Sequence, residues 1–286
     1  MNLQDKRVLI TGASGGIGRA LVLALLDAGA RVLLSGRDRD RLSRVVEHHE
    51  ERDRAGVFAA DITKAADRAS LCDYASRWHG GIDVLINNAA VNGFSLLSTQ
   101  PAESVDAAIA TNLVAPIDLC RRLSSCLARG EAAHIVNIGS VFGSIGFAGN
   151  SVYCATKFGL RGFSEALRRE LADTDVRVHY FAPRATRTTF NSDLVNDLNE
   201  VLGNASDEPA EVAMRVVRAL QDDQLEAVIG WPEKFFARLN AVLPRLVDKA
   251  LLRKLPTIRN FAGRSASVAR SQPAFVDGTV KPRRAS

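Results

Sequence analysis

The sequence contains little cysteine and no long hydrophobic run. It has no C-x-x-C pair and no His and Cys group with metal-ligand spacing, and its four cysteines are Cys72, Cys120, Cys126 and Cys154. This usage is typical of reduced thiols in a cytoplasmic protein, and it indicates no metal site. No apolar segment approaches the ~18 residues that a membrane-spanning helix needs. The N-terminal residues show no apolar signal segment, so we expect no secretory signal.

Lysine is also scarce, and the positive charge is unevenly placed along the chain. Residues 233–286 hold 12 Lys and Arg against 3 Asp and Glu, whereas residues 1–232 hold 25 against 29. The net charge of +5 therefore comes from the C-terminal segment. Because the body is slightly acidic, overall charge gives no reason to expect a nucleic-acid partner.

Short apolar runs alternate with longer segments of helical periodicity. Strands are predicted at 7–11, 31–35, 56–60, 83–87, 134–139, 176–181 and 226–230, and helices at 17–29, 38–54, 64–79, 102–128, 151–172 and 207–221. The runs are nearly continuous in Val, Ile and Leu, as parallel strands covered on both faces are. The alternation predicts an α/β fold, namely a Rossmann-type doubly wound parallel sheet of about seven strands with helices on both faces.

We divide the chain into three parts. Residues 1–230 form the predicted α/β domain, 231–262 a basic amphipathic helical extension that Pro244 breaks into two helices, and 263–286 a tail expected to be disordered. Within the α/β domain, Asp38 and Asp207 are expected to cap the helices that follow them, with Pro209 in the first turn of the second. Residues 182–206 break the strand–helix rhythm. They either lie over the ligand crevice or form a solvent-facing connector.

Glycines follow the first predicted strand and open the first helix, in the segment "VLITGASGGIGRAL". Gly12, Gly16 and Gly18 allow a tight turn and a close approach of the backbone to a phosphate. The helix N-terminus adds free N–H groups and the positive end of the helix dipole. Together with the strand before it and the helix after it, this pattern favours a dinucleotide-binding turn over a purely structural one.

The end of the second strand discriminates between nicotinamide cofactors. A carboxylate there would bind a ribose hydroxyl, and an arginine would bind a 2′-phosphate. The sequence has Ser35, Gly36 and Arg37 at this point. The guanidinium of Arg37 suits a phosphate, so NADP(H) is favoured over NAD(H). Alternatively, Arg37 is a solvated surface arginine.

At this point the chain resembles the classical short-chain dehydrogenase/reductase family over roughly residues 5–230. The glycine turn matches the family's T-G-x-x-x-G-x-G, "DIT" at 61–63 its adenine segment, and "NNAA" at 87–90 its N-N-A-G, with Ala90 in place of glycine. "TNLVAP", "NIGS" and "YCATK" follow in the family's order. The resemblance implies cofactor contacts at Thr11, Gly12, Ser14, Gly16, Ile17, Gly18, Arg37, Asp61, Ile62, Asn88, Ala89, Tyr153, Lys157, Pro183 and Thr188.

The resemblance also implies a catalytic set of Asn112, Ser140, Tyr153 and Lys157. The chemistry can be argued from the side chains, because a tyrosine donates a proton to a developing alkoxide if a nearby ammonium lowers its pKa. Positions i and i+4 place Tyr153 and Lys157 on one helix face. Ser140 can donate a hydrogen bond to the substrate oxygen. Only the resemblance gives Asn112 a role, which is to hold a water that relays protons towards Lys157.

Two segments depart from the family pattern. In "APRATRT", Arg184 replaces the usual glycine, and Arg184 and Arg187 are either solvated or contact an anionic group of the substrate. The extension alternates apolar and basic residues at helical spacing. It can pack over the substrate crevice, pack on a partner subunit, or make peripheral contact with an anionic membrane through residues 232–262.

The sequence thus predicts a cytoplasmic, NADPH-dependent carbonyl reductase or alcohol dehydrogenase. Its expected substrate is a small ketone or aldehyde, and the rest of that molecule is apolar or an acyl chain. A homodimer or homotetramer through the helices at 102–128 and 151–172 is implied by the resemblance. Two alternatives remain, a cofactor-sensing protein without turnover and a membrane-surface protein that acts through its C-terminal helices. A complete catalytic set argues against the sensor.

Overall fold

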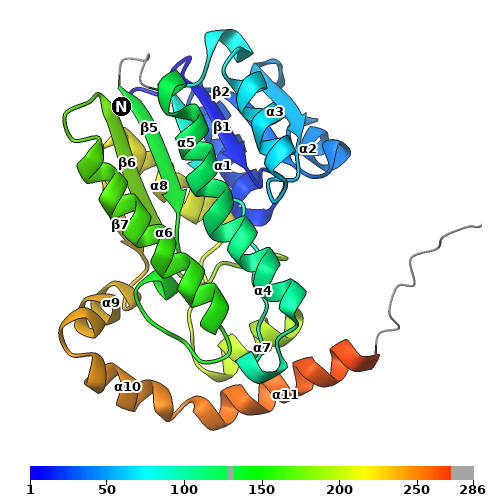
Figure 1. The fold of residues 1–286 in the computed structure, drawn as a ribbon, viewed down its shortest axis with the longest axis vertical. Helices are drawn as coiled ribbons and strands as arrows, with labels where there is room; N and C mark the ends of the chain where they lie inside the picture. The colour runs from blue at the N-terminus through cyan, green and yellow to red at the C-terminus, as the bar shows by residue number, and fades with distance from the viewer. Residues whose placement is uncertain (128–131, 272–286) are drawn as a thin grey trace, which may run out of the picture.

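The computed structural model describes residues 1–127 and 132–271, with the side chains of residues 265–271 left out. A seven-stranded parallel sheet forms its centre (Figure 1), in the order β3-β2-β1-β4-β5-β6-β7. The strands are β1 (Arg7–Thr11), β2 (Arg31–Gly36), β3 (Ala55–Ala59), β4 (Val84–Asn87), β5 (Ala133–Ile138), β6 (Val176–Pro183) and β7 (Glu226–Ile229). The order reverses between β1 and β4, which is where such sheets bind ligands at the carboxyl ends of their strands.

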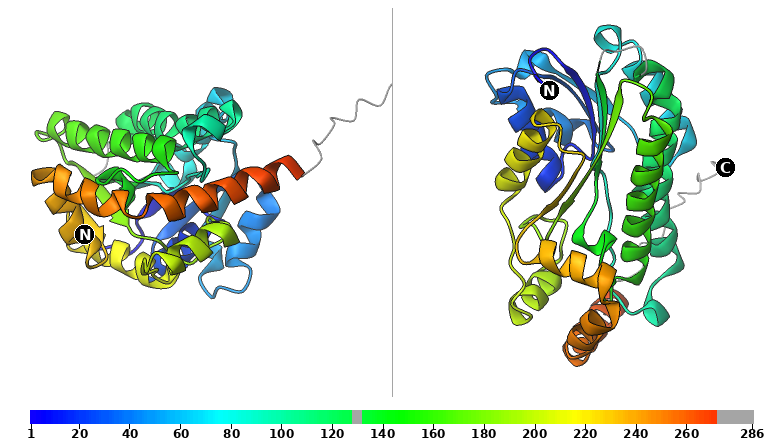
Figure 2. Two further views of the ribbon diagram at one scale, coloured as in Figure 1. Left: turned by 90° about the horizontal axis from the view of Figure 1, so that it is seen from below. Right: turned by 90° about the vertical axis from the view of Figure 1, so that its left-hand side faces the viewer.

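Helices cover both faces of the sheet, as the second view in Figure 2 shows. One face carries α1 (Gly16–Asp27), α2 (Arg39–Val46) and α8 (Pro209–Gln221), and the other carries α3 (Ala65–Ala75), α4 (Ala102–Ile109), α5 (Ala115–Leu127) and α6 (Ser151–Glu170). Both faces of the sheet are therefore buried against apolar helix surfaces. The predicted doubly wound fold is confirmed, and the near-continuous apolar strands follow from this two-sided burial.

Several predicted helix boundaries are wrong. The segment 38–54 forms α2 and a separate 3₁₀ turn (Arg52–Arg54), and the segment 64–79 gives α3 and a 3₁₀ turn (Trp78–Gly80). A π-helical turn (Ala110–Val114) interrupts the segment 102–128 between α4 and α5. Asp38 does cap α2, because its carboxylate accepts a hydrogen bond from the Arg41 N–H at 3.0 Å.

The expectation that Asp207 caps α8 is wrong, because Glu208 occupies the N-cap position and Pro209 begins the helix. Asp207 is 4% exposed and is paired with Arg184 instead. The segment 182–206 contains a helix of its own, α7 (Asp193–Val201), which its polar residues had obscured in the sequence.

Three helices form the C-terminal extension, namely α9 (Glu233–Val242), α10 (Pro244–Leu252) and α11 (Leu255–Ser271). Pro244 begins α10, so the predicted break is confirmed. Figure 1 shows these helices and α7 below the sheet, at the carboxyl ends of its strands. The disorder expected from residue 263 onward is wrong for residues 263–271, which continue α11, and residues 272–286 lie outside the described part. No helix among the described residues is long and apolar enough to cross a membrane.

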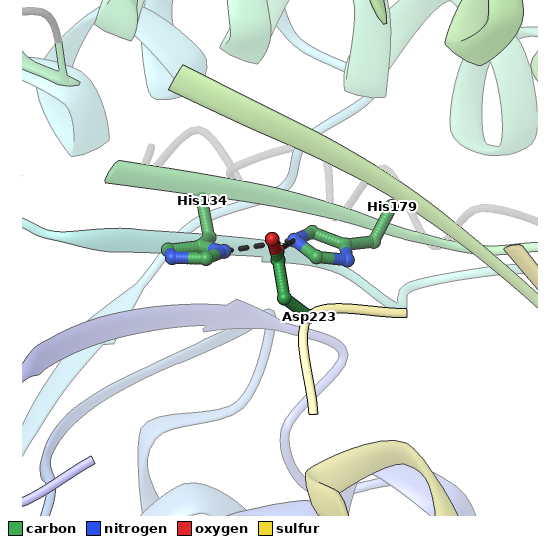
Figure 3. Close-up of side chains that lie close together, drawn as sticks. All are labelled: His134, His179 and Asp223. Atoms are coloured by element: carbon green, nitrogen blue, oxygen red, sulfur yellow. Dashed lines mark hydrogen bonds and ion pairs between the residues drawn. The ribbon is translucent and has the colours of Figure 1, made fainter. Parts of the chain in front are cut away.

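The opposite end of the sheet contains a buried pair of histidines that the sequence did not reveal. His134 and His179 lie on the neighbouring strands β5 and β6, and Asp223 lies on the turn before β7 (Figure 3). The His134 Nδ1 and His179 Nε2 atoms are 2.8 Å apart, which is the distance of a hydrogen bond.

The tautomers of this pair follow from its hydrogen bonds. The Nδ1 of His179 lies 2.9 Å from the carbonyl oxygen of Gln224, which can only accept, so this nitrogen is the donor. The neutral His179 ring then accepts at Nε2 from His134 Nδ1. The Nε2 of His134 is left buried without a partner. Burial, followed by the neighbouring His179, lowers the pKa of His134 to about 4.

This pair makes the protein less stable in acid. Between the ordinary histidine pKa of 6.5 and the folded pKa of about 4, the unfolded chain binds more protons than the folded one. The contribution of His134 to the free energy of unfolding is therefore complete above pH 6.5. It declines as the pH falls below that value, by about 1.4 kcal/mol per pH unit at most. We expect His134→Gln to reduce this slope in urea unfolding, and the exposed His48→Gln to leave it unchanged. Equal slopes for both variants and the wild type would contradict this assignment.

Candidate active site

A cavity of about 680 Å³ opens at the carboxyl ends of the strands. Its walls include the loops after β1, β2, β4, β5 and β6, together with α7, α9 and α10. The predicted site residues that line it are Gly12, Ser14, Gly16, Ile17, Gly18, Arg37, Asp61, Ile62, Asn88, Ala89, Ser140, Tyr153, Lys157, Pro183 and Thr188. Thr11 and Asn112 are buried behind this wall, at 1% exposure each.

The loop after β1 is shaped by contacts that only glycine permits. Gly12 has a φ of 65°, and a Cβ there would come within 2.7 Å of the Ala89 Cα atom. A Cβ on Gly18 would lie 2.8 Å from the Asn88 amide nitrogen, and one on Gly16 would overlap the side chain of Thr188. The loop therefore packs its backbone directly against its neighbours and presents the N-terminus of α1 to the cavity.

Hydrogen bonds join the ends of β1 and β4. The Thr11 hydroxyl accepts from the N–H groups of Asn88 and Ala89 at 3.1 and 3.2 Å. The Asn88 amide donates in turn to the carbonyl oxygens of Thr11 and Gly12, at 3.0 and 3.2 Å. Thr11 and Asn88 thus fix the glycine loop from behind. This cradle fits a dinucleotide, because a pyrophosphate needs close backbone approach and free N–H groups.

The loops after β2 and β3 contribute Arg37, Asp61 and Thr63 to the cavity wall. Arg37 is exposed there and, among the described residues, makes no ion pair within 4.0 Å. Thr63 donates to the Asp61 carboxylate from its hydroxyl at 2.7 Å and from its N–H at 3.1 Å. These hydrogen bonds lower the Asp61 pKa. Asp61 is thereby held as an acceptor at the cavity wall.

Ser140 and the Tyr153–Lys157 pair meet across the cavity. Ser140 follows β5, whereas Tyr153 and Lys157 lie one turn apart near the start of α6. Ser140 makes a hydrogen bond with the Tyr153 side chain. Lys157 Nζ lies 5.8 Å from the centre of the Tyr153 ring and donates to the Ile138 carbonyl oxygen at 2.9 Å. The structure therefore brings these three side chains together at one cavity.

The expected direction of the tyrosine pKa is wrong. Burial raises the pKa of Tyr153, and the hydrogen bond from Ser140 only partly opposes this. Lys157 is also buried, which lowers its pKa to about 8. Because burial raises its pKa, the phenol of Tyr153 stays protonated at neutral pH. A protonated phenol is the form that can donate a proton.

Asn112 lies on the π-helical turn between α4 and α5. Its Oδ1 accepts from the Val91 N–H at 2.8 Å, and its Nδ2 donates to the Val91 carbonyl at 2.9 Å and the Thr156 hydroxyl at 3.2 Å. Asn112 therefore joins the loop after β4 to α6. These contacts position neighbours of the site, and its side chain does not line the cavity.

Arg184 occupies a different environment from the one that the sequence suggested. Its guanidinium binds the Asp207 carboxylate at 2.6 Å, Glu233 at 3.4 Å and the Trp231 carbonyl at 3.1 Å. Arg184 thus fastens the start of α9 to the loop after β6. Arg187 is exposed and pairs with Glu208 at 3.2 Å, with its side chain 71% exposed. The idea that these two arginines bind an anionic substrate group is therefore not supported at Arg184, which is already paired within the chain.

Sequence reasoning left open whether residues 182–206 and the extension lie over the crevice, and it predicted none of the residues that α7 and the C-terminal helices contribute to the wall. Most of its members are apolar, and three are polar. They are Val195, Leu198, Asn199, Leu202, Asn204, Phe236, Val247, Leu251 and Lys254. The periodicity of the extension was visible, but its docking site was not, because distant contacts decide it. Of the three placements considered for the extension, the structure shows packing over the crevice.

Comparison with known proteins identifies the class. The family model described as short chain dehydrogenase matches residues 6–199. The chain is 33% identical over 226 residues to the 3-oxoacyl-(acyl-carrier-protein) reductase FabG of Vibrio harveyi. This alignment covers 76% of this chain and 90% of that protein. A metagenomic short-chain oxidoreductase solved with NADP is 32% identical, with a TM-score of 0.67 over 80% of this chain and 98% of its own.

A further solved structure is the 3-ketoacyl-(acyl-carrier-protein) reductase of Brucella melitensis complexed with NADH. It is 26% identical, with a TM-score of 0.72 over 80% of this chain and 98% of its own. The fold and the site define a nicotinamide-dependent oxidoreductase that acts on CH–OH or carbonyl groups. The chain belongs to the short-chain dehydrogenase/reductase family.

The Arg184 cluster supports a stability prediction. Arg184→Met leaves the Asp207 carboxylate, whose side chain is 3% exposed, without its charged partner. We expect a loss of about 3 kcal/mol in the free energy of unfolding, because a buried charge is left unpaired. Arg187→Met is the matched control, and its exposed pair should contribute less than ~1 kcal/mol. Equal losses in thermal or urea unfolding would show that Arg184 does not fasten this region.

Proposed function

We propose that the protein is an NADPH-dependent carbonyl reductase, with Tyr153 as the proton donor. The observation that carries this proposal is the meeting of Ser140, Tyr153 and Lys157 at a cavity whose other end is a glycine cradle. The aromatic rings of Phe142 and Phe190 lie 6.4 and 6.2 Å from the Tyr153 ring, which favours a substrate with an apolar body.

Each side chain has a defined task in this proposal. NADPH, when bound on the glycine loop, supplies the hydride. The Ser140 hydroxyl donates a hydrogen bond to the carbonyl oxygen, and Tyr153 donates its phenolic proton to that oxygen as negative charge develops. The Lys157 ammonium lies close enough to stabilise the phenolate that remains. Asn112 positions the loop after β4 and α6, and a water relay through it stays a proposal from the resemblance.

The central test is a panel of ketones and aldehydes, followed by the loss of NADPH absorbance. Tyr153→Phe keeps the ring but removes the proton, so we expect turnover to fall by at least ~100-fold. Its NADPH binding should change little. Reduction by the wild type should decline as the pH rises through about 8, where the Lys157 ammonium loses its proton. Turnover by Tyr153→Phe equal to that of the wild type would rule out this mechanism.

We also propose that the cofactor is NADPH rather than NADH. The support is local, because Arg37 at the cavity wall makes no ion pair with any residue that the structure describes, and no carboxylate ends β2. Arg41 lines the same part of the cavity. Related structures contain NADP or NADH, so preference within the family depends on such local residues.

Substitution of Arg37 tests the cofactor preference. We expect Arg37→Asp to weaken NADPH binding by roughly 10- to 100-fold, because a charge-assisted hydrogen bond to the 2′-phosphate is replaced by repulsion. NADH binding should be unchanged or stronger. The matched control is Arg39→Asp on α2, since Arg39 does not line the cavity. Equal losses of affinity for NADPH and NADH would mean that Arg37 does not bind the 2′-phosphate.

Two exposed apolar surfaces support contacts with other chains or with a membrane. Ile109, Val114 and Phe158, on the α4–α6 side, are each more than 40% exposed, which supports the homodimer or homotetramer that the resemblance implies. Sedimentation velocity would show this as a mass of two or four chains. The extension exposes a second set, in which Trp231, Val242, Leu246 and Leu252 are 71, 76, 54 and 62% exposed.

This second set favours peripheral contact with an anionic membrane, because exposed basic residues lie between its members. We expect the full chain to pellet with vesicles that contain phosphatidylglycerol. Leu246→Asp should reduce binding, since it places a negative charge in the apolar surface. Val201→Asp on α7 is the control, because Val201 is at least as exposed as Leu246, at 64% against 54%, but lies outside the extension. If wild type and Leu246→Asp pellet alike, the extension does not bind membranes.

A further inference from the structure

The substrate half of the cavity contains a cation without a carboxylate partner. Lys254 follows α10 and is half-buried at the cavity wall. Its Nζ donates to the Asn204 Oδ1 at 3.3 Å, and no carboxylate among the residues placed by the structure lies within 4.0 Å of it. An ammonium has three donors and a full charge, so a single neutral amide leaves most of its binding capacity free.

A short row of amides holds this lysine in place. The Asn204 amide nitrogen donates to the Asn199 Oδ1 at 3.1 Å, which turns the Asn204 oxygen towards Lys254. Asn199 and Asn204 also line the cavity. The row therefore presents the ammonium at the wall, in contrast to Lys234 and Lys249 of the extension, which are exposed.

The other cations of the cavity already have a partner or belong to the cofactor end. Lys157 binds the Ile138 carbonyl beside Tyr153, and Arg184 is paired with Asp207 and Glu233. Arg37 and Arg41 follow β2, at the cofactor end of the site. Lys254 is thus the cation on the substrate side, within the described wall, that is left for an anionic ligand.

Apolar side chains line the same cavity as this lysine and the reaction centre. They come from the loops after β4 and β5, from α7 and its C-cap, and from α10, and they are Phe94, Phe147, Val195, Leu198, Leu202, Val247 and Leu251. Leu198 packs with Ile258 and Phe261 of α11, so the helices that carry this wall support one another. A chain of methylene groups would fit such a wall, since it buries apolar surface on both sides.

We infer that Lys254 binds the carboxylate of an oxo-acid substrate, whose carbonyl lies at Ser140 and Tyr153 and whose apolar chain lies along α7 and α10. This inference rests on the proposed reductase function. One ammonium balances one negative charge, so a carboxylate fits better than a phosphate dianion, which usually meets several cations. Lys254 acts in binding and takes no part in the proton transfer.

The test uses pairs of probes that differ only in charge. The rates of NADPH-dependent reduction are compared for 5-oxohexanoate, 7-oxooctanoate and 9-oxodecanoate and for the corresponding neutral amides. We expect the acid to be preferred at one chain length or more. Lys254→Met should raise the KM for that acid by roughly 10- to 100-fold, with kcat nearly unchanged, because a charge-assisted hydrogen bond is lost. Its KM for the amide should not change.

Two further variants control for structural damage. Lys254→Arg keeps the charge and should restore most of the preference for the acid. Lys249→Met removes an exposed lysine from α10 and should behave as the wild type. If the wild type reduces acids and amides alike, or if Lys254→Met weakens both equally, the inference is wrong while the reductase function stands.

A binding measurement separates this inference from the reaction itself. Octanoate and octanamide are not reducible, and titration calorimetry with NADP⁺ present gives their affinities. We expect the wild type to bind octanoate more tightly than octanamide, and Lys254→Met to lose this difference. If no oxo acid or amide is reduced but octanoate shows this dependence on Lys254, the anion site stands and the reductase proposal fails. Equal affinities in the wild type would overturn the anion site.

Discussion

The packing of α6 against β5 is the constraint on which the site depends. A row of buried polar groups fixes it, because the Asn87 amide donates to Asn137 at 2.9 Å, the Asn137 amide donates to Ser164 at 2.8 Å, and the Ser164 hydroxyl donates to the Leu160 carbonyl at 2.7 Å. These bonds join β4, β5 and α6 in the buried interior, where the loss of a hydrogen-bond partner is costly. A shift of α6 along β5 would break them. The same register places Tyr153 opposite Ser140.

Much of this could be predicted from the sequence. The parallel sheet follows from apolar runs, and the glycine turn, Ser140, Tyr153 and Lys157 follow from motifs whose order and spacing are specific. The prediction that Asp38 caps α2 depends only on neighbouring residues, and it is confirmed. These features depend on residues close in the chain or on backbone geometry that only certain residues allow. Spatial proximity within the site then follows from the fold, because the carboxyl ends of neighbouring strands meet at one edge.

Distant contacts account for what the sequence could not show. Asp207 looked like a helix cap, but its burial beside Arg184 can be known only once β6 and α9 are placed. The His134–His179 pair arises because β5 and β6 are neighbours, although 44 residues separate the two histidines. The tyrosine pKa was misjudged for the same reason, since burial acts through the surrounding protein. Lys254 belongs to this group, because the cavity exists only after the extension has folded over the crevice.

We therefore propose that the family core places a hydride donor and a proton donor, and that the extension, which packs over the crevice, defines the substrate space. The most direct test of this proposal is the fate of the hydride. The protein is incubated with NADPH deuterated at the transferred position and with a mixture of 5-oxohexanoate, 7-oxooctanoate, 9-oxodecanoate and their amides. Mass spectrometry then measures the deuterium content of the products. The proposal predicts one deuterium on the carbinol carbon of a hydroxy product. Oxidation of NADPH without deuterium in any hydroxy product would contradict it.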